Sequence, residues 1–304
     1  MTYVLTTNAL RKRYGHCKAL DGLSMHVPSG AIYGFVGKNG AGKTTLIRVI
    51  CGLQEPLSGT YSLYGAQNGT ADIAKARRRM GAVIETPSIY LDMTAEENLK
   101  EQYLILGLPS FTGIPELLQL VGLADTGKKK AKDFSLGMRQ RLGIAVALAG
   151  DPDFLALDEP ANGLDPQGII EIRELILKLN RERGITVLIS SHILDELARL
   201  ATHYGFIDGG RIVKELSAEA LEAACKKCVR MEVTQTKALA RVLDGMDVDY
   251  TILSDTQADV YAKVNVSRLT LALQAADCEV VSMQERDESL ESYYMNLIGG
   301  EAHA

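Results

Sequence analysis

The stretch Gly37-Lys38-Asn39-Gly40-Ala41-Gly42-Lys43-Thr44-Thr45 decides the fold of this chain. It spells G-x-x-x-x-G-K-T and directly follows the apolar run 32–36, so we expect a glycine-rich loop where a strand passes into a helix. Glycines let backbone N–H groups point at phosphates, and the start of the helix adds the positive end of its dipole. The stretch predicts a nucleotide-phosphate site in which Lys43 reaches the β- and γ-phosphates and Thr44 offers its hydroxyl to Mg²⁺.

The composition is that of an ordinary globular protein. At 304 residues with 46% hydrophobic side chains, the chain is long enough for about two domains with real cores. A net charge of -5 argues against a nucleic-acid partner, because such proteins usually carry a strongly basic face. Five scattered cysteines predict free thiols in a reducing cytosol. No run approaches the roughly 18 apolar residues that span a bilayer, so any membrane role is expected to be peripheral.

Apolar runs and turn signals predict an α/β fold. The runs 154–157 and 186–190 have the form of strands buried on both faces, and an amphipathic helix over 168–183 joins them into a β-α-β unit of a parallel sheet. Before this unit we expect a β-rich start, a helix after the glycine-rich loop and a mainly helical region that extends to about Gly150. The expected N-terminal elements are strands over 3–5, 23–27, 32–36 and 59–65 and a helix over 45–52. Within the helical region, Thr94 and Glu97 have the spacing of a capping box.

Beyond Gly209-Gly210 the pattern changes to that of a small α+β appendix with the order β-α-β-β-α-β. The expected strands are 229–234, 250–253, 260–264 and 279–283, and the expected helices are 237–243, 269–276 and a terminal one over 289–298. No catalytic constellation is visible in this part.

Two adjacent carboxylates close the buried strand over 154–157. Asp158 is placed to hold Mg²⁺ through water, and Glu159 to orient a nucleophilic water beside it. Because ligands of open α/β sheets bind at the carboxyl ends of the strands, we expect this pair to face the glycine-rich loop.

Five motifs in order resemble those of the ATP-binding subunits of ABC transporters. They are Gly37–Thr45, Phe134-Ser135-Leu136-Gly137-Met138-Arg139-Gln140-Arg141, Leu155-Ala156-Leu157-Asp158-Glu159-Pro160, Asn162-Gly163-Leu164-Asp165-Pro166 and Ser190-Ser191-His192. The resemblance covers roughly residues 3–215. It implies a P-loop NTPase cassette with a RecA-like parallel-sheet core, an N-terminal β lobe and an inserted helical subdomain over about 86–150. That cassette, residues 1–215, is followed by a small α+β accessory domain over 216–304.

The resemblance also implies roles around ATP and Mg²⁺. Tyr14 resembles the aromatic residue that stacks on adenine, which needs only an accessible ring face. Glu159 matches the general base, Lys43 the phosphate-binding lysine, and His192 the switch histidine that senses the γ-phosphate. Thr44 and Asp158 match the Mg²⁺ ligands.

Three further positions match residues that act across a dimer. Ser135 and Gly137 match the signature motif that contacts the γ-phosphate of ATP held by the opposite subunit, and Asp165 matches the loop that crosses the interface. The resemblance therefore implies an ATP-dependent head-to-tail homodimer.

The chain departs from the family pattern at two places. Its signature Phe134-Ser135-Leu136-Gly137-Met138 keeps only the serine and the second glycine of the usual Leu-Ser-Gly-Gly-Gln. The usual glutamine before the helical subdomain corresponds to Glu85, whose carboxylate can still contact Mg²⁺ or its water. In having a glutamate there, the chain resembles the bacterial exporters that give immunity to bacitracin and lantibiotic peptides. The alternative is that the substitution has no functional consequence.

The resemblance implies an ATPase that drives a separately encoded membrane permease, docked near Glu85 and the helical subdomain. Such a subunit would be cytoplasmic, held on the inner face of the membrane through the permease. The main alternative is a soluble ABC-type ATPase that acts as a mechanical or regulatory module without a permease. A kinase with the same loop would need an acceptor pocket and would leave the signature motif unexplained. The accessory domain could regulate dimer closure or stabilise the cassette.

Overall fold

The computed structural model describes residues 2–224, 227–261, 266–276, 278–287, 293–294 and 297. The chain divides into two compact units, Met1–Ala218 and Glu219–Ala304. The boundary predicted after residue 215 lies close to this division.

A six-stranded sheet with the order β10-β9-β3-β8-β7-β6 forms the centre of the first unit. Its strands are β3 (Ile32–Val36), β6 (Met80–Val83), β7 (Phe154–Asp158), β8 (Thr186–Ser191), β9 (His203–Asp208) and β10 (Arg211–Ser217). All neighbouring strands pair in parallel except the edge strand β10, which is antiparallel to β9. Every residue of β3, β7 and β8 is buried, which confirms the predicted buried parallel sheet.

An antiparallel sheet with the order β2-β1-β4-β5 forms the N-terminal β lobe. Its strands are β1 (Tyr3–Tyr14), β2 (Cys17–Pro28), β4 (Ser58–Leu63) and β5 (Ala66–Gln67). The hairpin of β1 and β2 is much longer than the predicted strands 3–5 and 23–27. The reason is irregular register: shifts such as the one between Thr7 and Leu10 break the period-two alternation by which a strand is found in a sequence.

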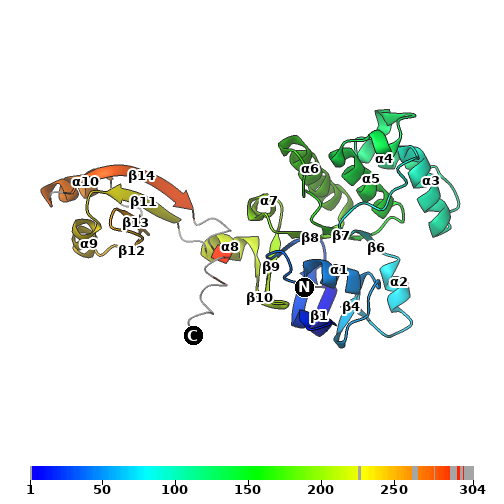
Figure 1. Cartoon of the computed structure of the whole chain (residues 1–304), viewed down its shortest axis with the longest axis horizontal. Coiled ribbons are helices and arrows are strands. Elements are labelled where there is room, and N and C mark those ends of the chain that lie inside the picture. Colours follow the sequence, from blue (N-terminus) through cyan, green and yellow to red (C-terminus); the bar gives the residue numbers. More distant parts are fainter. Residues whose placement is uncertain are drawn as a thin grey trace. The chain divides into compact units, whose positions relative to one another are not determined.

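Helices of the first unit surround the parallel sheet. They are α1 (Lys43–Ile50), α2 (Ile73–Arg77), α3 (Ala95–Leu106), α4 (Ile114–Leu120), α5 (Leu136–Leu148), α6 (Pro166–Arg183) and α7 (Leu194–Ala198), with 3-10 turns at Ala124–Thr126 and Ala131–Asp133. Helices α3, α4 and α5 gather into the helical subdomain, away from the antiparallel sheet (Figure 1). The predicted capping box of α3 is present, with Thr94 and Glu97 bonding each other's backbone N–H.

Several strands were not expected from the sequence, among them β5, β6, β9 and β10. Residues up to Gly150 read as mainly helical after the strand at 59–65, yet β6 lies among them and pairs with β7. With four residues, of which only Gly81 and Val83 are buried, β6 is too short to show a periodicity of its own. Its conformation comes from pairing with the sheet rather than from a local signal.

The second unit has the predicted order β-α-β-β-α-β. After α8 (Ala218–Ala224) come β11 (Lys227–Val233), α9 (Thr236–Asp244), β12 (Tyr250–Ile252), β13 (Gln257–Val260), α10 (Val266–Ala275) and β14 (Val280–Asp287). The sheet order is β12-β13-β11-β14, and all pairs are antiparallel. The strand predicted at 260–264 begins earlier, at Gln257 of β13, and Ala258 and Val260 enter the core, while residues 262–264 of the prediction lie outside the described residues. The predicted helix over 289–298 and Cys225 fall largely outside the described residues.

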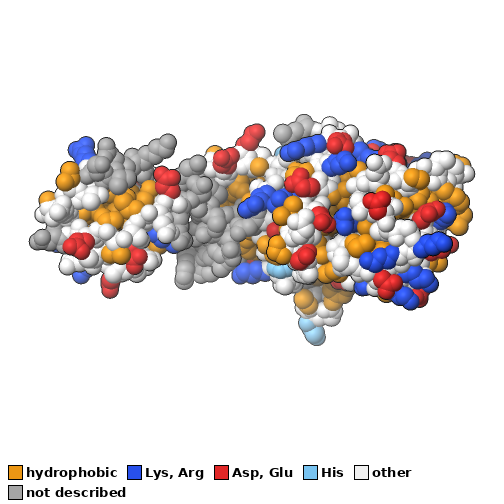
Figure 2. Space-filling view, turned by 90° about the horizontal axis from the view of Figure 1, so that it is seen from above, with side chains coloured by type: hydrophobic (Ala, Val, Ile, Leu, Met, Phe, Trp, Pro, Cys, Tyr) orange, Lys and Arg blue, Asp and Glu red, His pale blue; other side chains and the backbone are white. Residues whose placement is uncertain are grey.

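Acidic and basic side chains are interspersed over the face of the first unit drawn in Figure 2, in keeping with the modest net charge. Among residues 2–224 and the described parts that follow, no helix is both long and apolar enough to cross a bilayer.

Candidate nucleotide-binding site

The glycine-rich loop joins β3 to α1 and has a backbone that favours glycine at two positions. Gly40 has a φ of 81° and Gly42 a φ of 113°, both in the region that side chains disfavour. A Cβ on Gly42 would lie only 2.3 Å from the carbonyl oxygen of Ala19. The turn between β9 and β10 supports the loop, because the Gly210 N–H donates to the Ala41 carbonyl at 3.1 Å. The motif thus folds into a closely packed loop at a helix N-terminus, the arrangement that binds phosphates.

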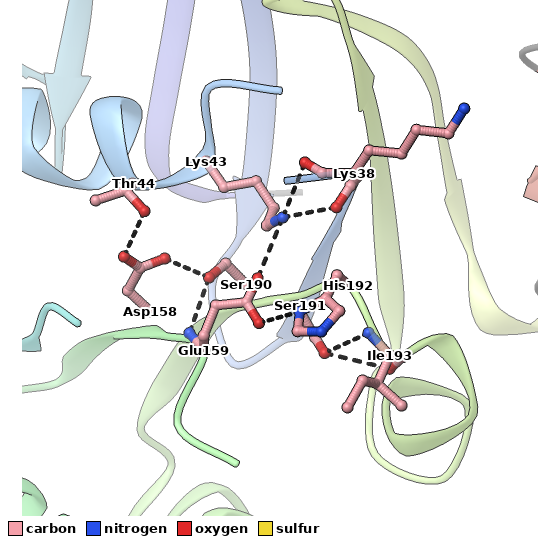
Figure 3. Close-up of polar contacts among 10 residues, drawn as sticks. Lys38, Lys43, Thr44, Asp158, Glu159, Ser190, Ser191, His192 and Ile193 are labelled. Atoms are coloured by element: carbon pink, nitrogen blue, oxygen red, sulfur yellow. Dashed lines mark hydrogen bonds and ion pairs between the residues drawn. The ribbon is translucent and has the colours of Figure 1, made fainter. Parts of the chain in front are cut away.

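Lys43 begins α1 and its side chain folds back over the loop (Figure 3). Its Nζ donates to the carbonyls of Gly37 at 2.6 Å and Lys38 at 3.3 Å, and it lies 3.2 Å from a carboxylate oxygen of Glu159. The side chain is only 5% exposed. Burying an ammonium group costs free energy unless the group is paired, so these oxygens hold the Lys43 ammonium in position beside the loop.

Asp158 lies at the end of β7 and is almost fully buried, with 1% of its surface exposed. One carboxylate oxygen accepts a hydrogen bond from the Thr44 hydroxyl at 2.6 Å, and the other accepts one from the Ser190 hydroxyl at 2.6 Å. Three elements, α1, β7 and β8, therefore bring hydroxyl and carboxylate oxygens together. Oxygen is the ligand that Mg²⁺ prefers, and because this ion keeps several waters it needs few protein groups.

Glu159 follows directly and has a φ of 51°, in the left-handed region that a non-glycine residue occupies only at a cost. Its N–H donates to both the hydroxyl and the carbonyl of Ser190, at 3.0 and 3.1 Å. Its carboxylate bridges two groups: one oxygen pairs with Lys43 and the other contacts Nδ1 of His192. Figure 3 shows these side chains converging where β7 and β8 end.

An open cavity of about 310 Å³ lies over this cluster. It is lined by Ala19, Asn39, Gly40, Gly42, Lys43, Thr44, Thr45, Glu159, Asn162 and His192. Its polar walls and buried ammonium suit a phosphate chain. The sequence analysis did not assign three residues of this site: Asn162, Ser190 and Ala19. Asn162 and Ser190 lie inside motifs of the ABC pattern, whereas no sequence signal marks Ala19.

A smaller cavity of about 30 Å³ lies between α6 and α7 and is lined in part by Glu159, Ser191 and Glu196. Burial raises the pKa of Glu196, the neighbouring His192 opposes that shift, and the charge of Glu159 adds to it. The cavity is large enough for a water molecule, but most of its wall is apolar, so Glu159 borders a largely apolar space on this side.

Three of the predicted residues do not line the nucleotide cavity but lie at helix starts. Ser135 is the N-cap of α5, with its hydroxyl accepting from the Met138 N–H at 3.2 Å, and Gly137 lies in the first turn. Asp165 is the N-cap of α6 and accepts from the Gly168 N–H at 2.9 Å.

Tyr14 and Glu85 are also absent from the cavity wall. Tyr14 ends β1, is 43% exposed, and its hydroxyl donates to the side chain of Gln54. The side chain of Glu85 is 59% exposed, and its carboxylate forms an ion pair with Arg48 at 2.9 Å.

A separate groove of about 740 Å³ lies beside the edge strand β6. It is lined by residues of α2, α3 and α5 and by the segment after β6, among them Arg77, Ile84, Ser88, Ile105 and Gly143. Apolar and polar side chains share its walls.

Comparison with known proteins agrees with this geometry. The family model for ABC transporters matches residues 20–162. The bacitracin transport ATP-binding protein of Bacillus licheniformis is 40% identical over 303 residues, which are 99% of either chain. The lantibiotic transport ATP-binding protein of Streptococcus pyogenes is 42% identical over 219 residues, covering 72% of this chain and 93% of that protein. A solved dimeric ATP-binding cassette, bound to ADP and phosphate after hydrolysis, matches with a TM-score of 0.63 and 25% identity, over 70% of this chain and 98% of that one.

Proposed function

The chain belongs to the ABC transporter family of ATP-binding proteins, and from that premise we propose that it powers a separate membrane permease that exports an antibiotic peptide or a related compound. The observation that carries the proposal is the convergence of Lys43, Asp158, Glu159 and His192 beside the glycine-rich loop. The exported class is supported by the bacitracin transport protein, which is similar over the full length, and by the lantibiotic transport protein.

The loop and Lys43 bind the phosphates of ATP. Thr44 and Asp158 would hold Mg²⁺, and the carboxylate of Glu85 would contact the ion or its water. When bound, this ion would neutralise phosphate charge in the transition state. Glu159 accepts a proton from the attacking water as the bond between the β- and γ-phosphates breaks and ADP leaves. His192, which contacts the Glu159 carboxylate, holds that side chain in place and meets the γ-phosphate. Tyr14 stacks on adenine through its exposed ring face.

ATP joins two copies of the chain head to tail. Ser135, Gly137 and Asp165 lie at the starts of α5 and α6, outside the cavity of their own chain, where they are available to a second nucleotide. The start of α5, a helix of 13 residues, offers a dipole end that favours an anion. The dimeric cassette among the solved relatives supports this assembly.

The permease docks in the groove beside β6, on the inner face of the membrane. The groove is large enough for a short helix of a partner, and Ile105 and Leu106 give it apolar surface that is exposed in the chain alone. Glu85 lies between two residues of its wall, Ile84 and Ser88. A permease that contacts the groove wall can therefore move Glu85, which is proposed to contact Mg²⁺.

ATP turnover of purified variants tests the catalytic part of the proposal. Glu159→Gln should bind ATP with an affinity near that of the parent and hydrolyse it at least a hundredfold more slowly, as loss of a general base usually costs that much. Lys43→Ala should weaken both binding and hydrolysis. Glu182→Gln, an exposed carboxylate of α6, is the matched control and should behave as the parent. A Glu159→Gln variant that hydrolyses ATP at the parent rate would overturn the assignment.

A further inference from the structure

Arg48 and Glu85 form an ion pair outside the cluster of Lys43, Asp158, Glu159 and His192. Nη2 of Arg48 donates to a carboxylate oxygen of Glu85 at 2.9 Å. The side chain of Arg48 is 35% exposed and that of Glu85 is 59% exposed, so the pair is open to water and can exchange partners.

The position of Arg48 connects it to the phosphate site. It lies in the last turn of α1, whose first residues are Lys43 and Thr44. Residues four apart on a helix share a face, so Arg48 lies one turn below Thr44 on the same side. The cation that pairs with Glu85 therefore lies on the same helix face as Thr44, the residue proposed as a Mg²⁺ ligand.

The position of Glu85 connects it to the groove. It follows β6 by two residues, and its neighbours Ile84 and Ser88 line the groove wall. Its φ of 57° is left-handed, a conformation that costs a residue with a side chain about 1–2 kcal/mol. The ion pair helps to keep this strained turn in place, and loss of the pair favours a change of backbone conformation.

We propose that Arg48 is the internal counter-ion of Glu85, and that the pair opens when the carboxylate turns to Mg²⁺ held with ATP. This inference rests on the proposed role of Glu85 at the Mg²⁺ site. Arg48 then competes with the metal for one carboxylate. When Glu85 exchanges Arg48 for Mg²⁺, the change in nucleotide occupancy reaches residues 84–88 of the groove wall. A glutamate suits this exchange because its charged carboxylate pairs with arginine more strongly than the neutral amide of a glutamine would.

Binding of Mn²⁺ as a paramagnetic substitute, measured by electron paramagnetic resonance with a non-hydrolysable ATP analogue, tests the competition without any turnover. An exposed pair contributes a few tenths to 1 kcal/mol, which corresponds to about a 1.5- to 5-fold change in affinity. Arg48→Met should lower the apparent Kd for Mn²⁺ by that factor, and Arg48→Lys by less. In the Glu85→Gln background, Arg48→Met should change nothing.

Lys75→Met is the matched control for simple loss of positive charge, since Lys75 is 84% exposed on α2 and pairs with Asp72. It should leave the Kd for Mn²⁺ unchanged. Amide hydrogen exchange adds a second readout: residues 84–88 should exchange faster in Arg48→Met than in the parent without nucleotide, and equally fast with the Mn²⁺ complex of the analogue.

If Arg48→Met lowered the Kd for Mn²⁺ equally in the parent and in the Glu85→Gln background, the inference would be overturned, because the effect would then be long-range electrostatics. No shift in either background, or weaker Mn²⁺ binding in Arg48→Met, would also overturn it. These outcomes are independent of ATP hydrolysis, so failure of the proposed catalytic roles would be seen separately in the turnover of Glu159→Gln.

Discussion

Alanine substitution at Gly42 should disrupt the phosphate loop far more than the same change at Gly40. Both glycines have a positive φ, and an alanine there costs about 1–2 kcal/mol in backbone strain. A Cβ on Gly40 would meet nothing within 4 Å, whereas one on Gly42 would lie 2.3 Å from the Ala19 carbonyl oxygen and 3.1 Å from a Leu20 methyl group. Such overpacking adds about 1–3 kcal/mol, so Gly42→Ala should cost about 2–5 kcal/mol in total.

Urea unfolding followed by circular dichroism and binding of a fluorescent ATP analogue measure the two effects. Gly40→Ala should shift the unfolding midpoint modestly and keep most of the affinity. Gly42→Ala should shift it further and lose at least tenfold in affinity, because relief of the clash moves the loop and the start of α1. Equal stabilities and affinities for the two variants would refute the reasoning from loop packing.

Three further predictions concern single side chains of the first unit. Ser190→Ala removes a buried donor to Asp158 and should cost about 1–3 kcal/mol of unfolding free energy, measured in urea, together with ATPase activity; retention of both would contradict the role of this bond. Hydrogen bonds from the backbone and hydroxyl of Thr94 lower the pKa of Glu97, so the stability that they add is present above the ordinary carboxyl pKa and is lost as the pH falls through the lowered value. Glu97→Gln should therefore be less stable than the parent at pH 7, by thermal unfolding, with the difference vanishing in acid; a constant difference would exclude this linkage. Burial raises the pKa of Cys51 to about 12, so little reactive thiolate is present at pH 8. Iodoacetamide at pH 8 should therefore modify Cys51 only after unfolding, which mass spectrometry can detect. Rapid modification of the native protein would contradict this prediction.

Local signals in the sequence predicted several structural elements of the candidate site. The phosphate loop, the strand that ends in Asp158 and the helix start at Thr94 each depend on residues close together in the chain. Continuous apolar runs such as 154–157 and 186–190 are typical of strands covered on both faces, and the structure confirms them.

Features that depend on contacts between distant segments could not be predicted in the same way. Strand β6 acquires its conformation by pairing with β7, and the hairpin of β1 and β2 is interrupted by shifts in register. The bond from Ser190 to Asp158 joins residues 32 positions apart, and the pair of Arg48 with Glu85 joins residues 37 apart. Neither spacing has a signature, because side-chain pairs across a fold follow from packing rather than from sequence periodicity.

The residues proposed as functional fall into two groups for the same reason. Those of the phosphate loop, Asp158, Glu159 and His192 come together within one chain. Ser135 and Asp165 instead cap helices and lie away from the cavity wall, so a site that includes them requires a second copy. The proposed mechanism therefore requires that ATP brings two chains together.

The most direct test is the mass of Glu159→Gln with and without ATP and Mg²⁺, measured by size-exclusion chromatography with light scattering. We expect a monomer of 33.0 kDa without nucleotide and a species of twice that mass with ATP, trapped because the variant cannot hydrolyse it. Ser135→Trp in the same background, which places a large side chain at the start of α5, should abolish the larger species. A monomer at saturating ATP, despite normal ATP binding, would contradict the central claim.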